Sequence, residues 1–172
     1  MVERFVRPLA RHGFVVTVLV SSLLAGATCA KAAPVSTGDI EEIRALFLRK
    51  AAAESAHDIK VMDEVLARAP EGQPDPVLLV ARAYQFEGRA AVLEHYRHVF
   101  TGTWRLEPDL SAVRIIPLGP DIAQIYAPTR VTIGAPGTPS EDAKTYPFLI
   151  NQFAIRTPDG WRISAIVPVP AQ

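Results

Sequence analysis

Hydrophobic residues along the chain recur with two different spacings, and the change from one to the other falls near Gly102. Val92, Tyr96, Val99 and Phe100 follow the spacing of residues on one face of an α-helix. Glycines stand at positions 88 and 102, and a glycine is typical of the residue that follows a helix. The pattern predicts a helix between these glycines, with helical segments before it and strands after it.

Two further helices are expected upstream. Asp39 followed by Glu42 fits a capping box, which predicts the start of a first helix over residues 39–56. The inward stripe of this helix consists of Ile40, Ile43, Phe47 and Ala51. Asp58 fits the cap of a second, shorter helix that runs to about Ala69. Prolines and a glycine between positions 70 and 76 then exclude a helix from the next segment.

Downstream of the central helix the apolar residues alternate with polar ones, which is the spacing of β-strands. Strands are expected over residues 104–118 (one long strand or a pair), 122–133, 147–157 and 161–169. An apolar run predicts a further strand from residue 77, or a small hairpin that ends at the central helix. Pro128 indicates a sheet edge or a bulge, because proline cannot donate a ladder hydrogen bond.

Helices followed by antiparallel strands indicate an α+β domain. A strongly twisted sheet of this kind curls around one helix face, and its inner face then lines a cavity that is open at one end. The 172 residues, of which 49% are hydrophobic and 21% charged, fit one globular domain.

The first 32 residues have the layout of a secretory signal peptide. Arg4, Arg7 and Arg11 precede an apolar run over residues 14–27, which is short for a membrane span of about 20 residues. Residues 30–32 fit an A-x-A cleavage pattern, so cleavage is expected after Ala32, with an uncleaved anchor as the alternative. Cys29 would be discarded with the signal, since the residues before it do not fit a lipoprotein signal. The expected organisation is signal 1–32, linker 33–38 and domain 39–170, in a periplasmic or secreted protein.

Charge and residue usage exclude several classes of function. After removal of the signal the chain has no cysteine, is mildly acidic and contains no basic run, which argues against nucleic-acid binding. No Cys/His spacing indicates zinc and no glycine-rich phosphate loop is present, so no metal and no cofactor are expected. Membrane contact is expected only through an uncleaved signal segment.

Four short motifs carry a resemblance to a known family. They are His57-Asp58, the segment 87–92 before the central helix, Gly119 to Ala123, and Asp159 to Ile163. Their order and spacing resemble the nuclear transport factor 2-like superfamily, and within it the SnoaL-like group, to which ketosteroid isomerase is related. The resemblance implies a cone-shaped barrel of a curved antiparallel sheet wrapped around N-terminal helices, and a homodimer. Members include isomerases, cyclases, a dehydratase and binding proteins, so the fold alone does not determine the function.

The enzymes that this fold resembles use carboxylates in the cone, and the predicted strands over residues 111–118, 122–133, 147–157 and 161–169 contain no Asp or Glu. His57, at a helix junction, and Tyr126 are therefore the candidate catalytic residues, as base and oxyanion donor. Asn151 and Gln152 face opposite sides of their strand, so only one of them points inward. The candidate ligand-binding residues are Phe47, Tyr84, Tyr96, Tyr126, Arg130 and Asn151.

Three functions follow as hypotheses. The first is an exported protein that binds a small, mostly apolar ligand in its cone, with catalysis left open. The second is an isomerase, cyclase or dehydratase that uses His57 and Tyr126. The third is a dimeric interaction module whose open sheet face binds a protein partner, in which case the polar strand residues lie on a solvated face.

Overall fold

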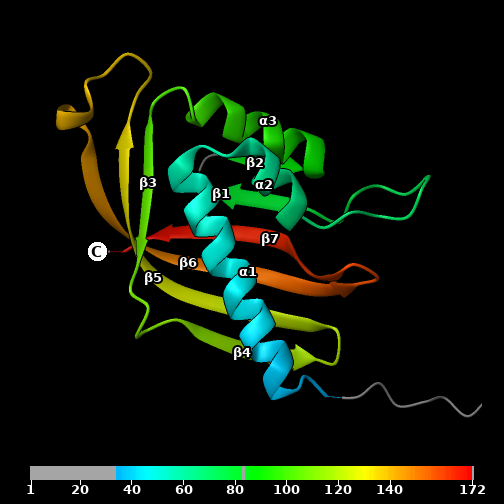
Figure 1. The fold of residues 1–172 in the computed structure, drawn as a ribbon. Coiled ribbons are helices and arrows are strands. Elements are labelled where there is room, and N and C mark those ends of the chain that lie inside the picture. Colours follow the sequence, from blue (N-terminus) through cyan, green and yellow to red (C-terminus); the bar gives the residue numbers. More distant parts are fainter. Residues whose placement is uncertain (1–33, 83, 172) are drawn as a thin grey trace, which may run out of the picture. The chain divides into compact units, whose positions relative to one another are not determined.

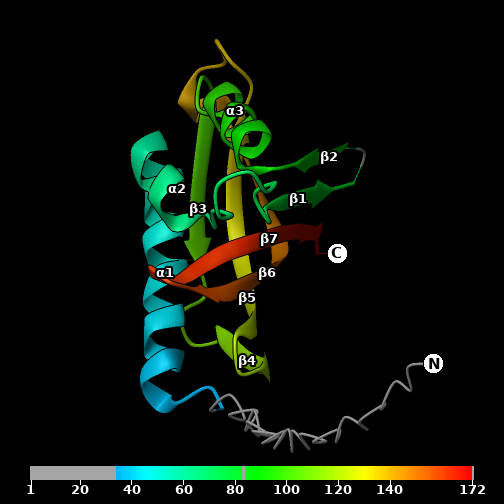
Figure 2. The ribbon, with the colours of Figure 1, turned by 90° about the vertical axis from the view of Figure 1, so that its right-hand side faces the viewer.

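A computed structural model describes residues 34–82 and 84–171, which comprise three α-helices and a seven-stranded sheet (Figure 1). The predicted signal peptide, its cleavage site after Ala32 and Cys29 lie outside the described residues. Helix α1, Thr37–Ala56, crosses one face of the sheet, and the prediction of an α+β fold is confirmed (Figures 1 and 2).

Helix α1 starts earlier than the sequence pattern predicts. Ser36 is the N-cap: its hydroxyl accepts a hydrogen bond from the Asp39 N–H at 3.2 Å, and the Asp39 carboxylate accepts one from the Ser36 N–H at 2.8 Å. The prediction that Asp39 and Glu42 form the capping box was wrong, because the serine and aspartate three residues apart make the same pair of bonds one turn earlier. Helix α1 is followed by its C-cap residue His57, whose backbone is left-handed with φ of 56°.

Helix α2, Ile59–Val65, begins as expected but ends before Ala69. Asp58 caps it by accepting hydrogen bonds from the N–H groups of Lys60 and Val61. The helix stops because the chain turns extended at Leu66, where a β-bridge to Ile163 forms. This long-range pairing satisfies backbone groups that a continued helix would satisfy locally.

Helix α3, Arg89–Val99, confirms the predicted central helix. Val92, Leu93 and Tyr96 form its buried side. Gly88 precedes the helix with φ of 81°, a conformation that favours glycine. The buried side faces the sheet, so α3 covers the end of the sheet that α1 leaves uncovered (Figure 1).

The sheet is mixed and open. Its strands are β1 (Leu78–Ala81), β2 (Tyr84–Glu87), β3 (Thr103–Pro108), β4 (Arg114–Gly119), β5 (Ile122–Gly134), β6 (Lys144–Thr157) and β7 (Gly160–Pro170). The order is β2-β1-β7-β6-β5-β3, and β4 also pairs with β5. The expected wholly antiparallel sheet needs one correction, because β1 runs parallel to β7. No hairpin joins these two strands, since α3 and five other strands lie between them in the chain, so their relative direction is free.

Pro128 occupies neither a sheet edge nor a bulge. It lies inside β5, where it pairs with Leu149 of β6. On the other side of β5, β3 begins its pairing at Thr129 and β4 at Tyr126, and the Pro128 carbonyl accepts a hydrogen bond from the Asp109 N–H. The proline nitrogen therefore faces the junction between β3 and β4, where no ladder hydrogen bond is lost.

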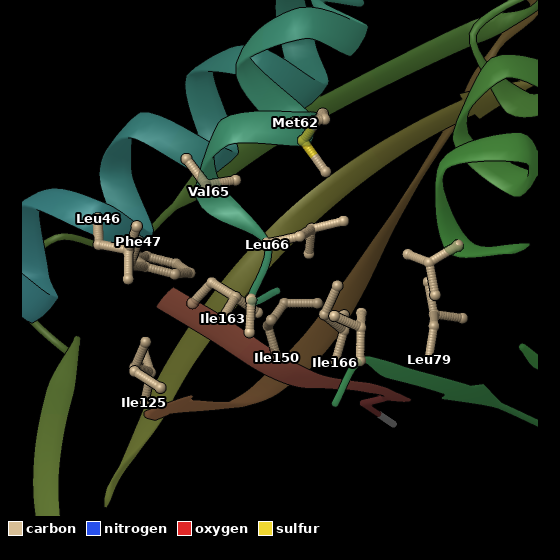
Figure 3. Close-up of a cluster of buried hydrophobic side chains, with 14 of the residues drawn as sticks. Leu46, Phe47, Met62, Val65, Leu66, Leu79, Ile125, Ile150, Ile163 and Ile166 are labelled. Carbon is tan, nitrogen blue, oxygen red and sulfur yellow. The ribbon is translucent and has the colours of Figure 1, made fainter. Parts of the chain in front are cut away.

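The two faces of the sheet differ in burial. Along β5 the odd-numbered residues from Ala123 to Val131 are buried, and the even-numbered residues are half-buried or exposed. The buried face packs against α1 and α2 in a core that includes Phe47, Met62 and Ile163 (Figure 3). We call this the inner face and the opposite side of β5, β6 and β7 the outer face. No helix in the described part of the chain covers the outer face (Figure 2).

Candidate functional site

A cavity of about 670 Å³ opens on the inner face, beside the hydrophobic core. Its walls come from the last turns of α1, from α3 and from the inner face of the sheet. Most wall residues are apolar or aromatic, among them Leu79, Tyr96, Val131, Phe148 and Ile166. Such a cavity has the size and character of a small-molecule site, where a few polar groups fix the orientation of a largely apolar ligand.

A buried ion pair stands in the wall that α1 contributes. The Lys50 ammonium lies 2.8 Å from Glu54 Oε1, and their side chains are 1% and 3% exposed. They lie together because residues four apart share one face of a helix. Ile43 and Phe47 precede them on the same stripe, so the stripe changes from apolar core to charged cavity wall along the helix.

Three buried polar atoms of cavity residues have no hydrogen-bond partner among the described residues. They are Glu54 Oε2, Gln152 Oε1 and Trp104 Nε1. Two of them are acceptors and the third is a donor. Because an unsatisfied buried polar group costs about 1–3 kcal/mol, this part of the wall is suited to a polar group of a ligand or to water.

Tyr96 of α3 joins the ion pair to the aromatic wall. Its ring is 2% exposed, and the Lys50 ammonium lies 5.5 Å from the ring centroid. Burial, together with the negative charge of Glu54, raises the pKa of the Tyr96 phenol well above its usual range. Tyr96 is therefore a neutral phenol at every physiological pH.

His95 lies toward the cavity mouth in a cluster of aromatic rings. Its ring stacks on Phe86 at 4.5 Å between centroids and lies 5.4 Å from Tyr84, which is 48% exposed. Burial lowers the pKa of His95 below 6.5, and the nearby His98 lowers it further. The imidazole is neutral at pH 7, so it can accept a proton or a hydrogen bond at the mouth.

Comparison with known proteins identifies the fold. No protein-family model and no curated protein sequence matches the chain. Among solved structures, a nuclear transport factor 2-like superfamily protein from Salmonella enterica matches with a TM-score of 0.65 and 16% identity, over 78% of this chain and 93% of that one. A candidate dehydratase of the same fold family from Streptomyces avermitilis gives 0.62 and 18%, over 78% and 97%. The chain has the nuclear transport factor 2-like fold.

A third structure with this fold is similar at a higher identity. It is a candidate calcium/calmodulin-dependent protein kinase type II association domain from Thiobacillus denitrificans, 27% identical, with a TM-score of 0.59 over 75% of this chain and 94% of that one. The names of the Streptomyces and Thiobacillus structures suggest different functions, and the name of the Salmonella structure gives only its superfamily. The nuclear transport factor 2-like fold is thus common to them, and the function must be argued from the cavity.

Within the nuclear transport factor 2-like fold, some of the residues predicted for the site line the cavity and the others lie outside it. Tyr84 and Tyr96 line the cavity, whereas Phe47 is 1% exposed in the hydrophobic core. His57 lies outside the cavity wall: its Nε2 is 3.2 Å from the Trp104 carbonyl oxygen. The ring of His57 also stacks on Phe100, the C-cap residue of α3, with the centroids 4.8 Å apart.

The other predicted residues lie on the outer face. Tyr126 and Arg130 are even-numbered residues of β5, while Val131 and the other cavity residues of that strand are odd-numbered. Asn151 pairs with Tyr126 across the ladder and accepts a hydrogen bond from Gln124 Nε2 at 3.1 Å. The structure therefore brings Tyr126 and Asn151 together, but on the side of the sheet away from the cavity.

Sequence reasoning missed Lys50, Glu54 and Gln152. The search for a carboxylate covered the strands, and the carboxylate of the cavity comes from α1. Positions 43, 47, 50 and 54 follow the helical spacing, so extending the stripe from Ile43 and Phe47 reaches both charged residues. Gln152 is 1% exposed and takes the inward position that the sequence left open between it and Asn151.

Two kinds of feature are absent from residues 34–82 and 84–171. No cluster of three or more His, Cys, Asp or Glu side chains there is arranged to hold a metal ion. In the same residues no helix has both the length and the apolar character that a membrane crossing requires.

Proposed function

We propose that this protein binds a small, mostly apolar molecule in the cavity between α1, α3 and the inner face of the sheet. The main support for this proposal is that the cavity combines about 670 Å³ of space with aromatic and aliphatic walls and a few buried polar groups. This combination is typical of small-molecule sites. The ion pair of Lys50 and Glu54 supports the proposal, because charged groups are rarely buried unless they are paired or have a role.

A cavity-filling substitution tests this proposal. Ala81 is buried in the cavity wall, whereas Ala90 is an exposed residue of α3 outside it. Ala81→Phe should abolish binding of the neutral fluorescent probe N-phenylnaphthylamine, and Ala90→Phe should leave the affinity unchanged. Fluorescence titration measures both affinities, and circular dichroism checks that each variant is folded. Equal binding by the two folded variants contradicts ligand capture in this cavity.

An acid–base enzyme is the second candidate, and Glu54 is the observation that favours it. Its Oε2 is buried in the cavity wall without a partner in the described structure, and a buried carboxylate can act as a proton acceptor. His95, neutral at the mouth, offers a second basic group. Because His57 and Tyr126 lie outside the cavity, Glu54 and His95 replace them as the proposed catalytic residues. Native mass spectrometry identifies a co-purified ligand, and carbon-bound deuterium in that ligand after incubation in D2O tests for proton transfer.

Homodimer formation also stays a proposal, and the outer face is the surface we assign to it. Ile116, Ile122 and Val169 are exposed there, between 37% and 43%. Phe153 and Val167 lie between them on the same face. Light scattering measures the subunit number, and Phe153→Arg should convert a dimer to a monomer.

Export with cleavage after Ala32 also stays a proposal, and N-terminal sequencing of the mature protein tests it.

A further inference from the structure

The polar atoms in the cavity wall indicate which chemical group the ligand carries. Glu54 Oε2 is an acceptor and Trp104 Nε1 is a donor, and neither atom has a partner at hydrogen-bond distance in the described part of the chain. The Tyr96 phenol is the nearby group whose pKa the Glu54 carboxylate helps to raise. We propose that the cavity selects an apolar molecule that bears a hydroxyl group, an alcohol or a phenol, and that this hydroxyl lies between the Glu54 carboxylate and the Trp104 indole. The inference rests on the proposed function and adds the ligand class.

The two residues come from elements that are fixed to each other. Leu106, two residues after Trp104 on β3, donates its N–H to Ser55 Oγ at 2.9 Å, and Ser55 follows Glu54 on α1. The Trp104 carbonyl oxygen lies 3.2 Å from His57 Nε2. These contacts hold β3, from Trp104 to Leu106, against the C-terminal end of α1. Both side chains also line the same cavity.

The ion pair leaves Glu54 with one acceptor oxygen to offer. Lys50 occupies Oε1, and the pair is almost completely buried. Gln152, 1% exposed in the opposite wall, presents a side-chain amide whose oxygen is also without a partner among the residues described. The wall therefore offers acceptors and a donor in a fixed arrangement that is neutral overall, because the charges of Lys50 and Glu54 cancel.

Only some ligand groups satisfy this arrangement. A carboxylate has acceptors alone, so it leaves Glu54 unsatisfied and brings a second negative charge beside it. A ketone, ester or ether also lacks a donor for Glu54. A primary ammonium lacks an acceptor for Trp104 and places a second positive charge near Lys50. A neutral hydroxyl donates one hydrogen bond and accepts another, and it thereby replaces a displaced water molecule without loss.

The rest of the cavity requires that the hydroxyl be carried on an apolar skeleton. Phe148, Ile150 and Ile166 form the sheet wall, and Tyr96 and Val99 face them from α3. Aromatic and aliphatic side chains gain most from contact with a ligand that has little polar surface. A sugar or a nucleotide, with many hydroxyl or phosphate groups, would leave most of these groups without partners.

Four probes that share one ring system test the inference: naphthalene, naphthol, methoxynaphthalene and naphthoate. The three substituted probes carry their substituent at the same ring position. Isothermal titration calorimetry with the full mature chain measures their dissociation constants. Naphthol should bind about tenfold or more tightly than methoxynaphthalene, because the ether cannot donate to Glu54. The double variant Lys50→Met/Glu54→Leu should lose this preference while it still binds naphthalene.

A matched control uses the opposite face of the sheet. Gln124 is a half-buried glutamine whose side chain lies on the outer face, so Gln124→Leu should keep the preference for naphthol. Equal affinity of the wild type for naphthol and methoxynaphthalene overturns the hydroxyl inference, as does tighter binding of naphthoate. A preference that persists in the folded double variant overturns the role of Glu54. Absence of binding by all four probes, naphthalene included, instead overturns the proposed binding function.

Discussion

The buried pair of Lys50 and Glu54 gives the most direct test of how the cavity wall is stabilised. Removal of one partner leaves the other as an unpaired charge in a wall where their side chains are 1% and 3% exposed. Such a loss typically costs about 3–5 kcal/mol, whereas replacement of both partners by apolar residues of similar size is neutral or stabilising by about 1–4 kcal/mol. We therefore expect Glu54→Leu to be strongly destabilising and Lys50→Met/Glu54→Leu to recover wild-type stability.

The expected loss is large compared with the total stability of a domain. Folded domains are stable by about 5–15 kcal/mol, so a loss of about 4 kcal/mol removes about a quarter or more of the free energy of unfolding. With an m-value of about 2 kcal/mol per M in urea, the unfolding midpoint of Glu54→Leu should fall by about 2 M. Urea titrations followed by circular dichroism measure the wild type, both single variants and the double variant as one thermodynamic cycle.

An exposed ion pair between α1 and α2 serves as the control. Arg49 of α1 pairs with Glu64 of α2, and their side chains are 51% and 43% exposed. Exposed pairs contribute about 1 kcal/mol or less, so Arg49→Met should shift the midpoint by well under half the amount expected for the buried pair. The reasoning is refuted if Lys50→Met/Glu54→Leu folds but is as unstable as Glu54→Leu alone, since burial of an unpaired charge would then not be the cause.

The remaining predictions concern pH and backbone packing. Hydrogen bonds, first from the Ser36 N–H and then from the Trp161 indole, hold the pKa of Asp39 below its ordinary value of 3.8. The contribution of Asp39 to stability is therefore present above pH 3.8 and is lost as the pH falls below it. The urea midpoints of the wild type and of Asp39→Asn should converge as the pH falls below 3.8. Burial lowers the pKa of His95 below 6.5, so the wild type should lose stability as the pH falls below 6.5, and His95→Gln should reduce that loss. A Cβ on Gly102 would lie 2.2 Å from the Gly134 carbonyl oxygen, so Gly102→Ala should lower the melting temperature, whereas Gly38→Ala in the open first turn of α1 should raise it.

The parts of the fold that local patterns determine were predictable from the sequence. The change of hydrophobic spacing near Gly102 correctly separated α3 from the strands, since each spacing reflects which side of a single element is buried. Features that depend on distant pairings were not predictable in this way. The early end of α2 follows from the bridge between Leu66 and Ile163, and the parallel pairing of β1 depends on β7, more than 75 residues further along the chain.

The cavity was less predictable because its charged residues occupy positions where apolar residues are the rule. Lys50 and Glu54 continue the inward stripe of Ile43 and Phe47, but a lysine or a glutamate in a sequence normally indicates a solvated position. Only the surrounding walls, which come from α3 and the sheet, make the last turns of α1 interior. A charged pair four residues apart on an otherwise apolar stripe is the local signal that was present.

The outer-face cluster shows how a single choice of strand face moves a predicted site across the sheet. In β6 both alternating sets of residues contain apolar side chains, Leu149 and Phe153 in one set and Ile150 and Ala154 in the other, so the pattern does not determine which set points inward. The pairing of Asn151 with Tyr126 was compatible with either face. Contact with the helices decides the matter, because the set that contains Gln152 packs toward α1 and the cavity. Tyr126 and Asn151, which were candidate ligand contacts, consequently lie on the outer face, the surface that we assign to a second copy of the chain.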